Sequence, residues 1–138
     1  MNLLGIQGDI KTQLATLGLN MQIADFPANP STYRLEDRRG AALVRFNGSS
    51  YERPTPNLSG QIVQIRRMEW VVTLVMSNLY EGDGLYAKLE TVRDGITGWT
   101  PPTSADLTVC YPLREAFVSE TAGQWMYEII FEVSGPEE

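Results

Sequence analysis

Residues Gln61–Asn78, QIVQIRRMEWVVTLVMSN, carry the strongest secondary-structure signal in the chain. In a β-strand successive side chains point to opposite faces. One face would hold Met68, Trp70, Val72, Leu74 and Met76, and the other Arg67, Glu69, Val71, Thr73 and Val75. The pattern predicts a strand long enough to extend beyond one small core. The adjacent Arg66 and Arg67 interrupt the apolar alternation, which predicts either a bulge or an exit from the sheet and, in both cases, an exposed basic pair.

Two segments on either side of this strand have helical spacing. Ile6, Ile10, Leu14 and Leu17 would form one apolar stripe on a helix that stops at Gly18. A second stripe is formed by Leu85, Leu89, Val92 and Ile96, with Asp83 placed to cap that helix. We therefore expect two helices that each bury one side.

Shorter strands and turns account for most of the remaining chain. Strands are expected at Met21–Ala24, Ala41–Phe46, Leu107–Tyr111 and from Gln124 to Val133. Asn47-Gly48 predicts a tight turn that returns Ser49–Glu52 against the preceding strand. A second hairpin would join Phe117–Glu120 to the last strand. Arg53–Gly60 reads as a projecting loop with two prolines, and Gly135–Glu138 should fray.

These elements predict one α+β domain over residues 1–138, with a mixed, mostly antiparallel sheet on which two helices pack. The chain of 138 residues is near the commonest domain size. It has no internal repeat and no evident domain linker. The N-terminus lacks the pattern of a signal peptide, and the apolar stretch Trp70–Met76 is too short to cross a membrane.

The composition argues against several classes of function. A formal net charge of −6 disfavours sequence-independent DNA binding. The absence of histidine removes histidine triads and histidine zinc sites, and the single cysteine, Cys110, cannot form a thiolate cage or an internal disulfide. Neither of the common nucleotide-binding glycine motifs is present. We expect a buried thiol, no cofactor, no metal and no enzymatic activity.

A group of carboxylates near the second helix is the main candidate for chemistry. Glu81, Asp83, Glu90 and Asp94 could in principle share a proton or hold a hard cation. Capping explains Asp83, and Glu90 and Asp94 lie four residues apart and off the apolar stripe, as on a solvated helix face. No loop has calcium-ligand spacing, so the structural interpretation is preferred.

The basic side chains are candidates for contacts with other molecules. Arg34, Arg38 and Arg39 form the densest cluster, although Glu36 and Asp37 neutralise much of its field. Arg66 and Arg67 carry more weight because they lie on a strand. We predict these five arginines as interface or lumen residues.

Apolar side chains on both faces of the strands give a physical reason for assembly. Val71 and Val75, together with Met126 and Ile130, would lie outside a core covered on one side only. Another helix or a neighbouring subunit would have to cover them.

The order of elements resembles that of the tail-terminator proteins of long-tailed bacteriophages, both Mu-like and lambda-like, over most of the chain. The resemblance is carried by four segments: the helix ending at Leu17-Gly18, the strand Ile65–Val75, the helix Leu85–Trp99 and the strand Trp125–Phe131. It implies a virion protein, assembled in the host cytoplasm, that caps the tail tube as a hexameric ring and ends its polymerisation. Its implied partners are the tail-tube protein, the neck or connector and possibly the sheath, with DNA passing through the lumen without specific binding.

Other virion joints have similar features. A neck or head-completion protein, or a baseplate component, is the alternative assignment. An enzyme would require a cleft with a strongly perturbed carboxylate.

Overall fold

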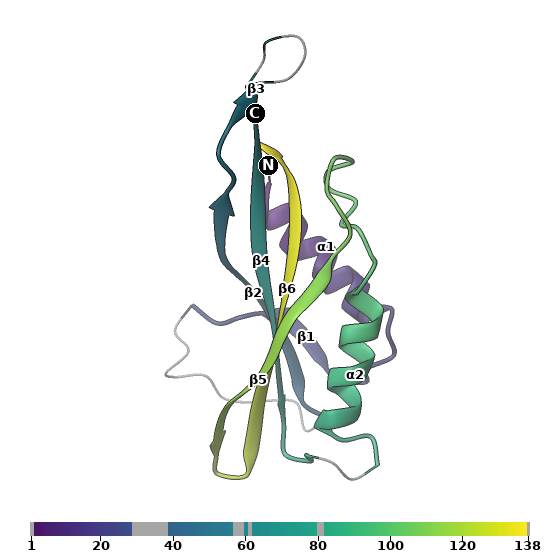
Figure 1. Ribbon diagram of the computed structural model, residues 1–138. Helices are drawn as coiled ribbons and strands as arrows, with labels where there is room; N and C mark the ends of the chain where they lie inside the picture. The colour runs from purple at the N-terminus through teal and green to yellow at the C-terminus, as the bar shows by residue number, and fades with distance from the viewer. Residues whose placement is uncertain (1, 29–38, 57–59, 61, 80–81, 138) are drawn as a thin grey trace.

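The computed structural model describes residues 2–28, 39–56, 60, 62–79 and 82–137 (Figure 1). The elements in chain order are α1 (Leu3–Ala15), β1 (Gln22–Asp25), β2 (Ala41–Tyr51), β3 (Thr55–Pro56), β4 (Ile62–Met76), α2 (Leu85–Ile96), β5 (Tyr111–Thr121) and β6 (Gln124–Glu137). The sheet has the strand order β1-β2-β4-β6-β5, and β3 pairs with the end of β4. β1 and β2 are parallel, whereas the other pairs are antiparallel. The predicted α+β class is confirmed.

β4 is the central strand, as its alternating sequence predicted. It pairs with β2 on one side and with β6 along almost its whole length on the other, from Gln64 opposite Glu137 to Met76 opposite Trp125. The strand continues through Arg66 and Arg67 without leaving the sheet. The alternation therefore predicted this strand correctly, whereas neither the bulge nor the exit predicted at Arg66 and Arg67 is observed.

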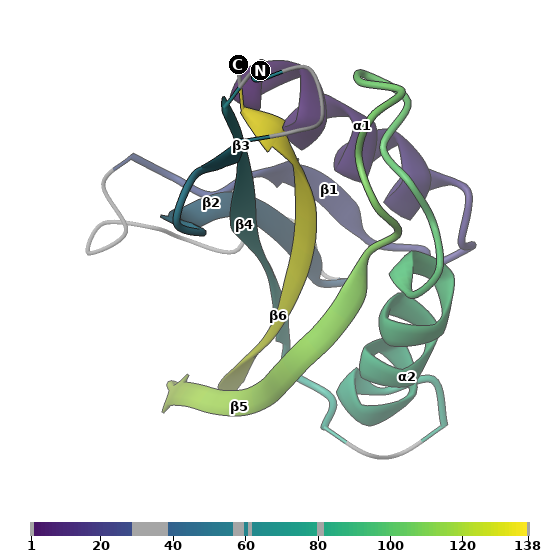
Figure 2. The ribbon, with the colours of Figure 1, turned by 45° about the horizontal axis from the view of Figure 1, so that its top comes forward.

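Both helices lie on one side of the sheet (Figure 2). The three apolar residues Ile6, Ile10 and Leu14 of α1 are buried, and Asn2 caps this helix by accepting a hydrogen bond from the Gly5 amide at 3.0 Å. The main core packs the helices against the predicted inner face of the sheet. Its strand residues include Met68, Trp70, Val72, Leu74, Met76, Ile129, Phe131 and Val133. The apolar residues Leu85, Leu89, Val92 and Ile96 of α2 are buried as predicted. The stripe of α1 is confirmed up to Leu14, but Leu17 lies beyond the end of the helix, which ends before the predicted Gly18.

The opposite face of the sheet is covered within the chain, which corrects the physical argument for assembly. Val71 is fully buried, and Val75 and Ile130 are each 2% exposed. Phe26, just after β1, packs with Val75, and the Arg45 guanidinium lies 5.5 Å from the centre of the Phe26 ring. Three of the four predicted residues are therefore buried within the chain and do not require a neighbouring subunit, whereas Met126 is only partly buried.

Asn47-Gly48 forms a bulge, which makes the predicted tight turn wrong. The pairing of β2 with β4 shifts between Phe46, opposite Trp70, and Gly48, opposite Glu69, and then continues to Tyr51. Gly48 has a φ of 122°, which suits glycine. The long β4 offers backbone partners beyond the bulge, so β2 continues outward and does not fold back.

Three other local predictions were also wrong. Residues 135–137 are paired to β4 because that strand extends far enough to meet them. Residues 107–110 precede the strand, since β5 begins at Tyr111 and the Cys110 amide donates to the Trp99 carbonyl at 2.7 Å. The N-cap of α2 is Gly84, whereas Asp83 forms an ion pair with Lys88 at 2.6 Å. In each case the segment pairs with a residue that the local pattern does not reveal, because this residue is distant in sequence or lies on the helix itself.

Gly40 is expected to be intolerant of any side chain. Its φ is 107°, and a Cβ there would lie 2.7 Å from the Val75 carbonyl oxygen. Gly40→Ala should therefore lower the free energy of unfolding by about 1–3 kcal/mol, measured by urea denaturation. Gly48→Ala is the control, because its φ is also positive but nothing lies within 4 Å of the added Cβ. Equal losses for both variants would show that the contact at Gly40 is unimportant.

Candidate assembly interface

The predicted basic cluster is only partly described. Arg34 and Arg38 lie outside the described residues. Arg39 is exposed and donates a hydrogen bond to the Asn20 side chain at 2.9 Å. The cluster remains a prediction.

Arg66 and Arg67 lie on opposite faces of β4 and do not form a single basic patch. The Arg66 guanidinium lies 5.8 Å from the centre of the Phe46 ring and 5.7 Å from that of Tyr51. Arg67 forms an ion pair with Glu52, and this hydrogen bond raises the pKa of Arg67. Both cations are thus held by groups of the same chain at the end of the sheet next to β3.

The outermost strand β5 carries most of the large apolar side chains of the sheet that are exposed. It pairs with β6 on one side, and no described strand pairs with its outer edge. Its exposed apolar residues, with Val109 just before it, are Tyr111, Leu113, Phe117 and Val118. Phe117 is 53% exposed. A long edge strand with exposed apolar groups promotes association, which soluble proteins normally suppress with charges or a covering element.

The hairpin predicted from Phe117–Glu120 to the last strand is confirmed, but the sequence reasoning assigned no strand to residues 112–116 and missed this surface. The available signal was the odd-numbered apolar series Val109, Tyr111, Leu113 and Phe117. Pro112 lies within this series, and a proline argues against a strand assignment. Two register shifts in the pairing with β6, between Pro112 and Arg114 and between Phe117 and Ser119, also interrupt the regular alternation.

A groove of about 360 Å³ lies between α2 and β5. We call it the α2–β5 groove; its lining residues are Tyr86, Leu89, Glu90, Arg93, Glu115, Ala116, Phe117 and Tyr127. The Tyr127 ring centre lies 6.0 Å from that of Tyr86 and 5.5 Å from that of Phe117. A hydrogen bond with Tyr86 raises the pKa of Tyr127. The groove therefore combines three aromatic side chains with three charged ones.

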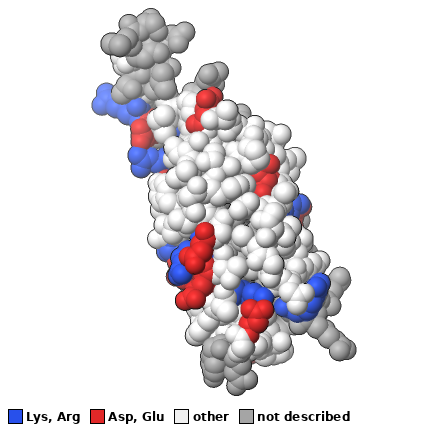
Figure 3. Space-filling view, turned by 90° about the vertical axis from the view of Figure 1, so that its right-hand side faces the viewer, with Lys and Arg blue, Asp and Glu red and all other residues white. Residues whose placement is uncertain are grey.

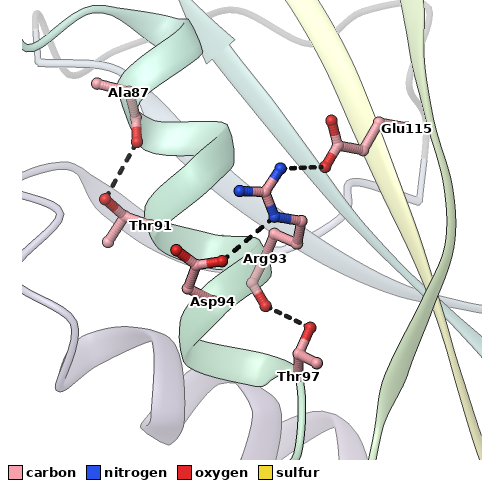
Figure 4. A network of polar contacts seen from close by, with 6 residues as sticks. All are labelled: Ala87, Thr91, Arg93, Asp94, Thr97 and Glu115. Atoms are coloured by element: carbon pink, nitrogen blue, oxygen red, sulfur yellow. Dashed lines mark hydrogen bonds and ion pairs between the residues drawn. The ribbon is translucent and has the colours of Figure 1, made fainter.

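Arg93 connects the two walls of this groove (Figure 4). Its guanidinium lies 3.2 Å from the Asp94 carboxylate and 3.6 Å from that of Glu115 on β5. The hydrogen bond to Asp94, followed by the charges of Asp94, Glu115 and Glu90, raises the pKa of Arg93. Glu90 forms no hydrogen bond or ion pair with any described residue. The cation is thus close to two carboxylates and also interacts with the charge of a third, Glu90.

Charged groups are sparse on the side of the molecule that carries α2 (Figure 3). The view shows broad areas without Lys, Arg, Asp or Glu between small, separate charged clusters. Such a surface suits contact with protein better than contact with a polyanion.

Nothing in the described part of the chain forms a metal centre. No group of three or more Cys, Asp or Glu side chains could hold a metal ion there. Glu90 and Asp94 are exposed on α2, as expected for a solvated helix face. Among the described residues no helix is long and apolar enough to cross a membrane.

Cys110 is buried, as predicted, and its burial raises the pKa of the thiol from 9.0 to about 12. A pKa that is higher in the folded state favours folding below pH 9, and this contribution is lost as the pH rises towards 12. The stability of the wild type should fall by about 1.4 kcal/mol per pH unit more than that of Cys110→Ala in this window. Urea unfolding from pH 9 to 11 measures the difference, and parallel pH dependences would contradict it.

Comparisons with known proteins agree with this architecture. A family model described as "Gp37 protein" matches residues 10–137. A chain in the solved structure titled "Virion of native gene transfer agent (GTA) particle" is similar, with a TM-score of 0.57 and 16% identity. The match covers 95% of this chain and 94% of that one, so the shared fold includes almost every element. No curated protein matches the chain.

Proposed function

Because the chain belongs to the Gp37 family, we propose that it is a structural protein of a phage-type virion and works by assembling with other subunits. The similarity in fold to a chain of the gene transfer agent virion supports this role. No residue is assigned a catalytic task. The whole chain acts as one domain in this proposal.

The specific role that we propose is that of a tail terminator. Copies of the chain form a hexameric ring, cap the tail tube, end its polymerisation and offer a surface to the neck, while DNA passes through the lumen. The resemblance of the sequence to tail terminators supports this role, as does a structure with the expected two helices on a mixed sheet. A ring needs head-to-tail contacts between two different patches of each subunit.

The exposed apolar edge of β5 is the observation that carries the proposal. Its side chains include Phe117 and Val118, which are left exposed although most other large apolar side chains of the sheet are buried. Association with another chain would remove these groups from water, at roughly 25 cal/mol per Å² of apolar surface. The exposed apolar surface that favours assembly thus lies on β5 and not on the central strands β4 and β6.

A neck or head-completion protein, or a baseplate component, would need the same kind of surface. The phenotype of a particle that lacks the gene separates these roles. A terminator null should produce tails of abnormal length, and a copy of the gene supplied in trans should restore normal length. Electron microscopy of the particles provides the measurement. Full heads beside tails of correct length that fail to join would contradict the terminator role and favour a neck protein.

A further inference from the structure

A short basic, proline-containing segment lies at one end of the sheet. We call residues Arg53–Pro56 the arm; they follow β2 and include β3, which pairs with the beginning of β4. The arm lies at the top of the molecule in Figure 1, and in Figure 2 it is again far from α2. Arg53, Pro54 and Pro56 are exposed. Proline restricts the backbone here, so the arm would lose little conformational entropy on binding.

The charge of the arm is not neutralised by any contact within the described part of the chain. Arg53 forms no hydrogen bond or ion pair with another described residue. Its neighbour Glu52 is already engaged by Arg67. In a chain of formal net charge −6, the arm therefore carries an exposed cation that no described carboxylate engages.

The α2–β5 groove has complementary chemistry. Its aromatic residues, Tyr86, Phe117 and Tyr127, provide the flat apolar surfaces on which extended proline-containing segments pack. Glu90 supplies an exposed carboxylate that forms no hydrogen bond or ion pair with a described residue, although its charge acts on Arg93, whose guanidinium also lies near Asp94 and Glu115.

We propose that the arm of one copy docks in the α2–β5 groove of a neighbouring copy, with Arg53 of one chain facing Glu90 of the other. The arm and the groove lie too far apart in one chain to meet, so the contact joins two copies. The two patches differ, which makes the contact head-to-tail and compatible with ring closure. This inference rests on the proposed self-assembly and names the contact that produces it.

A charge-reversal cycle on the full-length chain tests the contact. Arg53→Glu and Glu90→Arg should each weaken self-assembly at least about tenfold, because each places like charges together. The double variant should recover to within about threefold of the wild type. The control is Lys11→Glu, a charge reversal on α1, which contributes no residue to the arm, to the groove or to β5 and should leave assembly unchanged. Native mass spectrometry over a concentration series measures assembly, and circular dichroism verifies folding.

Each result has a distinct meaning. A wild type that assembles, combined with single reversals that assemble equally well, would overturn the docking of the arm and leave the ring intact. Single reversals that fail without recovery in the double variant would overturn the pairing of Arg53 with Glu90. A wild type that stays monomeric would overturn the proposed self-assembly itself.

Discussion

Replacing Trp70 by alanine is expected to lower the free energy of unfolding by about 3–5 kcal/mol. Trp70 is 1% exposed at the middle of β4, and its ring centre lies 5.1 Å from that of Phe46. Its removal would leave a large cavity between the sheet and the helices, which the rigid strands on both sides cannot fill. Urea denaturation followed by far-ultraviolet circular dichroism measures the loss.

Trp70→Phe serves as the matched variant. The indole Nε1 is buried and has no hydrogen-bond acceptor among the described residues, so phenylalanine removes an unsatisfied donor while it keeps most of the apolar contact. We expect this variant to lose less than half as much stability as Trp70→Ala. Similar losses for both would show that the cavity is not the main cause.

Replacing Phe117 by glutamate is expected to weaken self-assembly about 30-fold or more, which corresponds to roughly 2 kcal/mol. The side chain is half-exposed on β5 and lines the α2–β5 groove, so a charge there would meet the apolar groups of the neighbouring copy. Analytical ultracentrifugation of the full-length variant measures the change.

Leu4→Glu is the control for this substitution. Leu4 is 82% exposed on α1, away from β5, and should tolerate a charge without any effect on assembly. Both variants should unfold at nearly the same urea concentration as the wild type. If Leu4→Glu disrupts assembly and Phe117→Glu does not, the interface lies on the side of α1.

The regular elements could be predicted because their signals are local. Alternation over Gln61–Asn78 gave β4, and helical spacing gave α1 and α2. The errors arose where a distant partner changed a local preference. Asn47-Gly48 is a good turn sequence, but the length of β4 kept β2 extended, and the same length ordered Gly135 against Arg66.

The candidate interface could be predicted less well than the fold. The charge of Arg66 and Arg67 predicted that they lie at the surface. The sequence does not show that Arg66 packs on Phe46 or that Arg67 forms an ion pair with Glu52. The apolar residues of β5 resemble core residues in sequence. Only the strand order, which places β5 at the edge of the sheet, shows that Phe117 is exposed.

The mass of the purified full-length chain in solution tests the central claim most directly. Native mass spectrometry over a range of concentrations, alone and with tail-tube protein, should show a closed oligomer of the 15.4 kDa subunit, with a hexamer as the expected species. A strict monomer under all these conditions, with no binding to the tube protein, would contradict the account.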